Sequence, residues 1–458
     1  MTRQDLEQLD HAALVELALR LQDRVAELEA RQPPASPPPK TPSNSSLPPA
    51  KSFKPARRPP SGAKRGPKPG HLGCSRLRAT PDQVLVCAPT TCACGAELTA
   101  APRQRVGRHQ LTELPPLRAV VLEAWRYQVR CPGCGRTTTA PLPPGFTRGR
   151  VFGPRLSAVV SYLHQQHHVS YGRLPQLTAT LFGLHLSQGA LVHHLQRTAS
   201  ALAPTAEAIR QQVRASPVIG SDETSARVDG RTWWQWVFQT PQASYHTLQP
   251  SRSAAVLSEV LEEAVPAVWV SDLYPGQLRH PAQQLQVCLA HQLRDLEYAR
   301  DCGDRAIPAR RQAAFSEPMQ RLFREAIHLA HRRDQGQLLR DSAAYQQAVA
   351  RLERRCDRLL RLRRVAPAGQ KLQARYRQHR QSLFVFLHDA RVPPTNNGSE
   401  QALRPSVVHR KVSGGFRSDW GAAAHATLAT VLQTARKRGQ DLFDALLAPL
   451  GPALPQFA

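Results

Sequence analysis

Two apolar runs that each end in an acid are the main pattern in the middle of the chain. The first begins at Val218 and ends at Asp222, and the second spans residues 267–270 and leads through Ser271 to Asp272. Such runs predict buried strands. A carboxylate delivered to the end of a buried strand is costly unless it pairs with a base or binds a metal, although a lone acid there can also simply cap a turn.

The segments around these acids predict the rest of a sheet. Apolar and aromatic runs at 232–240 and 244–249 predict two further strands, residues 253–264 a helix, and residues 285–289 a short strand that leads into a helix. Three strands, a helix and a fourth strand follow the order of an RNase H-like α/β sheet. Neighbouring strands one and four would set Asp222 and Asp272 side by side.

Residues 150–205 carry helical patterns ahead of this core. They predict helices at 154–167, at 172–182 and from Ser187, which is a good N-cap, with Gly183 at the end of the preceding helix. This order predicts a helix-turn-helix, with Ser187, His193 and His194 in the DNA-binding region. An ordinary helical bundle explains the pattern equally well. We interpret the histidines at 164, 167 and 168 as surface or DNA-facing, because they lack a fourth metal ligand.

The N-terminal 80 residues predict a helix and a linker. Leucines seven residues apart at 14, 21 and 28 predict a coiled-coil helix over residues 1–31, which either associates with a second copy or packs on its own chain. Residues 32–80 are rich in proline and predict a disordered linker. Between Lys40 and Arg78 there are ten Lys or Arg residues and no acid. We expect Arg57, Arg58, Lys64 and Arg65 there to contact phosphates loosely, rather than to form a merely solvated tail.

Composition limits the partners. Lys and Arg outnumber Asp and Glu by 61 to 34, a formal net charge of +27 over 458 residues, which favours a nucleic-acid partner. A membrane surface is the competing partner, yet the chain has no apolar run of 18 residues and no signal-peptide pattern. Nine cysteines, four of them in two tight clusters, suit a reducing compartment. We therefore expect a cytoplasmic protein, associated with the nucleoid when bound to DNA.

Cysteine spacing predicts a zinc-ribbon-like domain over residues 81–145. Cys92 and Cys94 form one cluster and Cys131 and Cys134 a second, around a strand expected at 119–129. Paired cysteines on two glycine-containing turns supply a tetrahedral zinc site. The first pair is separated by one residue instead of two, so Cys87 and His109 are alternative ligands, and unligated cysteines remain the competing interpretation.

A long helical segment separates the second acid from the end of the chain. Residues 294–391 contain 22 Lys or Arg and 11 Asp or Glu residues and have helical patterns throughout. They predict a helical insertion over residues 296–391. Arginines on it recur three or four apart and either line DNA or form solvated helix faces; they are Arg351, Arg354, Arg355, Arg358 and Arg361.

Six motifs in order resemble the transposases of the insertion sequence 66 family, over nearly the whole chain. They are Pro42-Ser43-Asn44-Ser45-Ser46, Ser221-Asp222-Glu223-Thr224, Trp269-Val270-Ser271-Asp272, Cys288-Leu289-Ala290-His291, the stretch from Asn396-Asn397-Gly398-Ser399-Glu400 to Arg404-Pro405 with Arg410-Lys411, and Thr434-Ala435-Arg436-Lys437-Arg438-Gly439. Six such matches in the right order are hard to obtain by chance.

The resemblance implies a DDE transposase whose catalytic acids are Asp222, Asp272 and Glu400. It implies a catalytic core at residues 215–295 and 392–440, a C-terminal tail at 441–458, double-stranded DNA at element ends and target, a homo-oligomer on DNA and small accessory proteins. Two Mg²⁺ or Mn²⁺ ions held by the acids would activate the attacking oxygen and stabilise the leaving one.

Further residues near the third acid are expected to have supporting roles. Glu400 is expected on a helix from about residue 398 to 408, where Arg404 shares its face and orients it or holds a phosphate. Arg410 and Lys411 would contact phosphate, and surface ion pairs are the alternative. For Cys288 and His291 we expect packing and a structural hydrogen bond instead of metal ligation. The competing functions are a non-catalytic, domesticated or decayed, DNA-binding protein and a structure-specific nuclease on the same fold.

Overall fold

The computed structural model describes residues 77–279, 282–303, 315–363 and 365–451, together with six helical residues between positions 13 and 20. The described residues fall into two compact units. The larger unit contains the six residues between 13 and 20, residues 124–175 and those from 186 onward, and the smaller one contains residues 77–123 and 176–185. Apart from those six helical residues, the predicted coiled coil lies outside the described residues, as does nearly all of the predicted linker, including Arg57, Arg58, Lys64 and Arg65.

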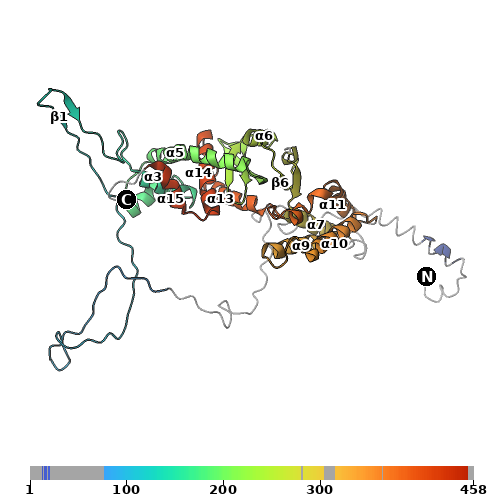
Figure 1. Cartoon of the computed structure of the whole chain (residues 1–458), viewed down its shortest axis with the longest axis horizontal. Helices are drawn as coiled ribbons and strands as arrows, with labels where there is room; N and C mark the ends of the chain where they lie inside the picture. The colour runs from blue at the N-terminus through green and yellow to red at the C-terminus, as the bar shows by residue number, and fades with distance from the viewer. Residues whose placement is uncertain are drawn as a thin grey trace. The chain divides into compact units, whose positions relative to one another are not determined.

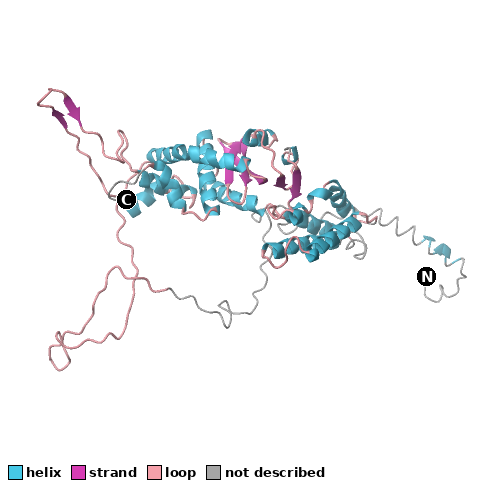
Figure 2. Ribbon diagram, viewed as in Figure 1, coloured by secondary structure: helices cyan, strands magenta, loops and turns pink. Residues whose placement is uncertain are grey.

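A five-stranded mixed sheet forms the centre of the larger unit, with strand order β5-β4-β3-β6-β7 (Figures 1 and 2). The strands are β3 (Val218–Val228), β4 (Arg231–Gln239), β5 (Ser244–Gln249), β6 (Val268–Ser271) and β7 (Gln284–Val287). The first three form an antiparallel meander, and β6 and β7 run parallel to β3. All five strands predicted for this sheet are confirmed, as is the adjacency of the first and fourth.

The hairpin between β3 and β4 has a two-residue turn at Asp229 and Gly230. Both residues have positive φ, 46° and 71°. Two left-handed residues match the right-handed twist of the flanking strands, which is why Asp-Gly is a frequent sequence for this turn. The turn fixes the register in which Val228 faces Arg231 and Asp222 faces Val237.

Helices cover the sheet and its exposed edge. The elements are α3 (Pro154–Gln165), α5 (Gln188–Arg214), α6 (Ala255–Leu261), α13 (Asn397–Ser413), α14 (Asp419–Lys437) and α15 (Leu442–Leu447), and η4 (Ala448–Leu450) follows the last of these. Helix α13 packs on β3 and β4, and α14 packs on β5. Backbone N–H groups of Ser244 and His246 on β5 donate to the hydroxyls of Thr434 and Thr430 on α14 at 3.0 and 2.9 Å. These bonds satisfy donors that an open edge strand would expose.

The predicted insertion is helical. It contains α7 (Leu289–Gly303), α9 (Ser316–Asp334), α10 (Ala343–Leu360), α11 (Pro367–Gln378) and α12 (Val385–His388), with short 3-10 turns η2 (Gln277–Arg279) before it and η3 (Arg380–Ser382) within it. One apolar core joins these helices to the sheet, from Val270 and Val287 on the strands to Phe323 and Tyr376 on α9 and α11. The insertion is therefore packed onto the β6–β7 side of the sheet.

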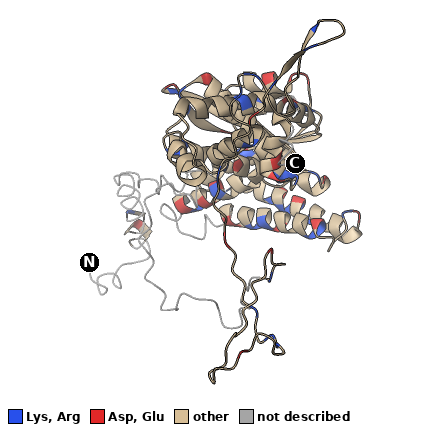
Figure 3. Ribbon diagram, turned by 90° about the vertical axis from the view of Figure 1, so that its left-hand side faces the viewer, with Lys and Arg blue, Asp and Glu red and all other residues tan. Residues whose placement is uncertain are grey.

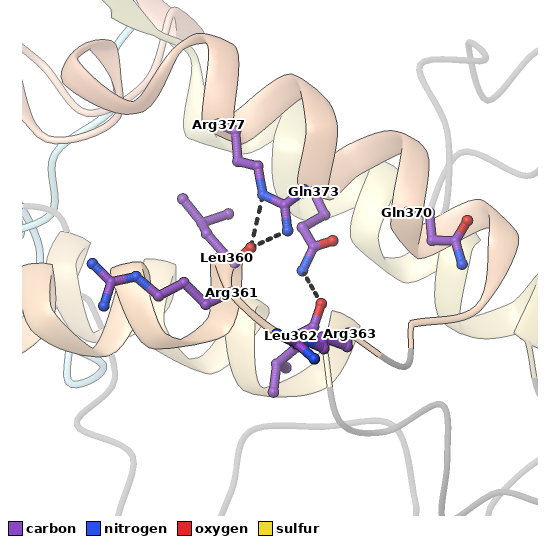
Figure 4. Close-up of a pocket in the computed structure, with 7 residues that line it drawn as sticks. All are labelled: Leu360, Arg361, Leu362, Arg363, Gln370, Gln373 and Arg377. Carbon is purple, nitrogen blue, oxygen red and sulfur yellow. Dashed lines mark hydrogen bonds between the residues drawn. The ribbon is translucent and has the colours of Figure 1, made fainter.

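Arginines on the insertion are partly paired. Arg355 pairs with Glu325, and Arg380 pairs with Asp357 at 2.6 Å, while Arg351 is exposed. Basic and acidic residues of these helices are interspersed in Figure 3. A cavity of about 740 Å³ at the end of α10 is lined by Arg361, Arg363, Arg377, Gln370, Gln373, Leu360 and Leu362 (Figure 4). The predicted catalytic acids do not line it.

Residues 119–129 differ from the prediction. Only the last two belong to a strand, β1 (Gln128–Arg130), which pairs with β2 (Thr137–Thr139). Residues 119–127 have no regular structure and are mostly exposed. An apolar, β-prone run becomes a strand only where a partner strand or a packed face stabilises it, and this one has neither over most of its length.

The helices of the predicted helix-turn-helix are present. Helices α3 and α5 belong to the larger unit, whereas most of α4 (Leu174–Phe182) belongs to the smaller one. Ser187 caps α5 as predicted, because its hydroxyl accepts the backbone N–H of Ala190 at 3.2 Å. Within the part of the chain that the structure describes, no helix has the length and apolar character needed to cross a membrane.

Candidate active site

Asp222 lies on β3, and Asp272 directly follows the neighbouring parallel strand β6 at the same level. Strand β3 pairs with β6 up to Gly220 opposite Val270, and each acid is the second residue beyond that pair. Adjacent strands are ~4.8 Å apart, so the same register brings the two carboxylates to one level of the sheet. Burial first, then the charges of neighbouring acids including Asp272 and Glu400, raise the pKa of Asp222 well above its usual value.

Glu400 reaches the same place from the first turn of α13, a helix that was predicted at about residues 398–408 and extends further in both directions. Its Oε1 accepts a hydrogen bond from Nη2 of Arg294 on α7 at 3.1 Å. The Nε2 atom of His291 lies 3.5 Å from the same oxygen. Two basic side chains from α7 thus hold the third acid.

The sequence did not predict that Arg294 contacts the third acid. Arg404, which was expected to orient Glu400, is exposed, and so is Lys411. Arg410 donates to the hydroxyl of Ser225 on β3 at 3.2 Å. Positions 400, 404 and 411 fall on one face of α13, so Arg404 lies about one turn from the third acid and Lys411 about three turns from it. The only signal for Arg294 was its place three residues after His291 on the same helix.

The neighbouring acid Glu223 has a different environment. Its side chain is 1% exposed and accepts hydrogen bonds from Arg252 at 2.6 and 2.8 Å and from Gln277 at 2.5 Å. The guanidinium of Arg252 lies 3.8 Å from the ring centre of Tyr274. The backbone N–H of Tyr274 donates to Asp272 at 3.0 Å. Glu223 therefore anchors the loop that follows the second acid.

The three acids can be compared with what a divalent cation requires of its ligands. Among the described residues, no group of three or more His, Cys, Asp or Glu side chains stands in an arrangement that could hold a metal ion. The acids are nevertheless close enough for Asp272 and Glu400 to disfavour the charged form of Asp222. Carboxylate oxygens are the ligands that Mg²⁺ prefers. The donor set therefore fits a divalent cation, whose charge would offset this repulsion.

Two histidines differ from their predicted positions. His193 is exposed, but His194 has no exposed surface and its Nδ1 lies 2.8 Å from the hydroxyl of Ser157 on α3. His164, expected at the surface, is also buried and bonds the carbonyl of Val169 at 2.8 Å. Both rings lie on the apolar faces of their helices, where packing of α3 and α5 excludes them from the surface.

The four predicted zinc ligands are exposed thiols on two separate turns. Cys92 and Cys94 belong to the smaller unit, and Cys131 and Cys134 to the larger one. In each turn a glycine with positive φ, Gly95 or Gly135, donates its N–H to the carbonyl of the first cysteine at 2.8 Å. Backbone N–H groups lower the pKa of the Cys92 and Cys131 thiols. Each turn thus favours a thiolate.

Comparisons with known proteins agree with this organisation. The model of the family described as "Transposase IS66 family" matches residues 149–424, more than half of the chain. Two proteins of Sinorhizobium fredii, strain NBRC 101917 / NGR234, are similar over short segments. The uncharacterized protein y4qI is 40% identical over 67 residues, 15% of this chain and 12% of its own length. The uncharacterized protein y4jO is 32% identical over 103 residues, 22% of this chain and 32% of its own length.

Both similar segments cover well under two thirds of those relatives, so the family assignment comes from the match over residues 149–424. That range begins before α3 and ends within α14, and so includes Asp222, Asp272 and Glu400. The chain belongs to the IS66 transposase family.

Proposed function

We propose that this protein is a DNA transposase that cleaves the ends of an insertion element and joins them to target DNA. The observation that carries the proposal is the placement of Asp222 and Asp272 on adjacent parallel strands at equal register, with Glu400 brought in by α13. A three-strand meander followed by two parallel strands supports the RNase H-like core that the sequence predicted.

The three acids are the residues that would hold two Mg²⁺ or Mn²⁺ ions. Bound there, the ions would supply Lewis-acid stabilisation of both the attacking and the leaving oxygen in an in-line phosphoryl displacement. Arg294 orients Glu400 through its hydrogen bond. Arg404 and Lys411, exposed on the same face of α13, are placed to contact a DNA phosphate.

Other parts of the proposal rest on the sequence. The net charge of +27 favours double-stranded DNA as the partner. A zinc ribbon, a helix-turn-helix, oligomerisation through residues 1–31 and small accessory proteins are further proposals that the family resemblance supports. Among the alternatives, a structure-specific nuclease would use the same acids without requiring element ends, and a decayed copy would bind DNA and leave it uncut.

The test is strand cleavage of a duplex that carries element ends in Mg²⁺. Asp272→Asn should reduce cleavage to background, because the amide cannot replace a carboxylate ligand. The matched control is Asp229→Asn, an exposed acid in the β3–β4 turn whose positive φ asparagine tolerates. Full activity of Asp272→Asn would overturn the proposal. Equal DNA binding with no cleavage by any variant would favour the non-catalytic alternative. Cleavage of branched substrates that lack element ends would favour the structure-specific nuclease.

A further inference from the structure

Each of the three acids is preceded by a buried serine. Ser221, Ser271 and Ser399 come directly before Asp222, Asp272 and Glu400, and all three serines have no exposed surface. These serines lie on three different elements, β3, β6 and α13. A single chain of hydrogen bonds connects them, and it passes through two residues that are not among the predicted catalytic acids, Asn396 and Cys288.

Asn396 connects the first and third acids. Its side chain is 1% exposed. The Nδ2 group donates to the backbone carbonyl of Ser221 at 2.6 Å, and Oδ1 accepts the hydroxyl of Ser399 at 2.6 Å. A carbonyl oxygen can only accept, so the amide orientation is fixed. One side chain therefore joins β3, just before Asp222, to the first turn of α13, just before Glu400.

Cys288 connects that junction to the second acid. Its backbone N–H donates to the carbonyl of Ser271 at 2.8 Å. Its Sγ accepts the backbone N–H of Asn396 at 3.0 Å and lies 3.3 Å from Nδ1 of His291. The other ring nitrogen of that histidine faces Glu400. The thiol group thus contacts Asn396, which joins α13 to β3, and His291, which lies beside Glu400.

We propose that Asn396 and Cys288 are positioning residues that hold the three carboxylates in mutual register. This inference rests on the proposed function, because register matters only if the three acids act together. A displacement of about 1 Å can reduce the rate of a positioned reaction by ~10²-fold. Loss of the Asn396 donor also leaves the buried Ser221 carbonyl without its partner, at a cost of roughly 1–3 kcal/mol.

The first test exploits opposite expectations for Cys288. If the thiol only fills space, Cys288→Ala is the milder change and Cys288→Ser the more harmful one, since serine buries an extra polar group. If Sγ is a required acceptor, the serine hydroxyl can replace it. We expect Cys288→Ser to keep cleavage within about 3-fold of wild type and Cys288→Ala to lose about 10-fold or more, with unchanged DNA affinity. The reverse ranking would overturn the proposal.

The second test uses the adjacent asparagines. Asn396→Asp preserves shape and the acceptor for Ser399 but removes the donor to Ser221, so we expect a loss of ~10²-fold in cleavage rate. Asn397→Asp is the matched control, since Asn397 is exposed and one residue away, and should stay within about 3-fold of wild type. Thermal unfolding of both variants checks that each is folded. Equal rates for the two variants would contradict the role of Asn396.

A readout without DNA separates this inference from the proposed function. Mn²⁺ affinity, measured by calorimetry, should fall in Asp222→Asn and also in Asn396→Asp, but not in Asn397→Asp. A wild-type protein that binds Mn²⁺ through Asp222 and cuts no DNA would refute the function and leave the positioning role standing. Unchanged Mn²⁺ affinity in Asn396→Asp would overturn the positioning role, and a wild type with neither property would contradict both.

Discussion

Nη2 of Arg294 lies 3.1 Å from Oε1 of Glu400, although 106 residues separate them in the chain. Arg294 is on α7, which begins directly after β7, and Glu400 is in the first turn of α13. The helical insertion lies between the two in sequence. The pair therefore shows how the site stays compact despite the insertion. The chain leaves the sheet through α7, and after the insertion α13 brings the third acid back against α7.

Removing Arg294 should weaken the binding of a metal ion by Glu400. A hydrogen bond to a charged group contributes about 1.5–3 kcal/mol, so Arg294→Ala should lower cleavage by roughly 10- to 100-fold and raise the Mg²⁺ concentration needed for half-maximal rate. Arg300→Ala, further along α7 and paired with Glu297, removes the same charge and should change neither. Equal effects of the two variants would mean that only net charge matters.

Two glycines allow α13 to approach β3 and β4. A Cβ atom at Gly398 would lie 2.6 Å from Nε2 of Gln239, and one at Gly220 would lie 2.9 Å from Oδ1 of Asn396. Overpacking of this kind costs about 1–3 kcal/mol. We expect Gly220→Ala to lower both unfolding temperature and cleavage rate, because the Asn396 side chain that it meets is held by two hydrogen bonds. Gly172→Ala is the control, because a Cβ there meets nothing within 4 Å. Equal unfolding temperatures and cleavage rates in the two variants would show that the close approach does not affect stability or activity.

Acid should destabilise the protein through its buried histidines. Burial and the nearby His164 and His168 lower the pKa of His409 to about 3, and its ring lies 4.7 Å from that of His425. Unfolded histidine has a pKa of about 6.5. This stabilising contribution is thus complete above pH ~6.5 and is lost as pH falls toward 3, since unfolding then takes up a proton.

His409→Phe should reduce by one the number of protons that the protein takes up when it unfolds in acid. Phenylalanine keeps an aromatic ring against Phe416, whose ring centre lies 5.6 Å away. The slope of unfolding free energy against pH between 6.5 and 4 should become shallower by about 1.4 kcal/mol per pH unit. Urea unfolding at several pH values measures this. An unchanged slope in His409→Phe would refute it, and the exposed His193 provides the control substitution.

Zinc content tests the sequence-based metal prediction. We expect about one zinc ion per chain, lost in Cys131→Ser and in Cys92→Ser, as measured by elemental analysis of the purified protein. Cys87→Ser should retain the metal if Cys92 and Cys94 are both ligands. Loss of zinc in Cys87→Ser would instead assign the ligand to Cys87, and absence of zinc from the wild type would leave the cysteines unligated.

The sequence was sufficient for the sheet because its strands are marked locally. Apolar runs ending in acids located β3 and β6, and Ser187 located the start of α5. Contacts that depend on tertiary packing were not accessible in this way. Nothing near Arg294 in sequence indicates that it meets Glu400, and the burial of His194 follows from the packing of α3 on α5.

Local pattern also misled where no partner strand was present. Residues 119–127 have a β-prone composition but no regular structure. Conversely, Asn396 stood in a motif that the family resemblance identified, yet its bond to the carbonyl of Ser221 depends on the docking of α13 against β3. Motifs located the elements of the site, and the contacts between elements required the structure.

Glu400→Gln is the sharpest test of whether the three acids form one site, because Glu400 comes from a helix that is distant in sequence from both aspartates. The measurement is Mg²⁺-dependent cleavage of element-end DNA by wild type and by this variant, with DNA affinity determined in parallel. If the three acids form one site, the glutamine variant binds DNA as wild type does and cleaves it at background rate. Cleavage at the wild-type rate by Glu400→Gln would contradict the account.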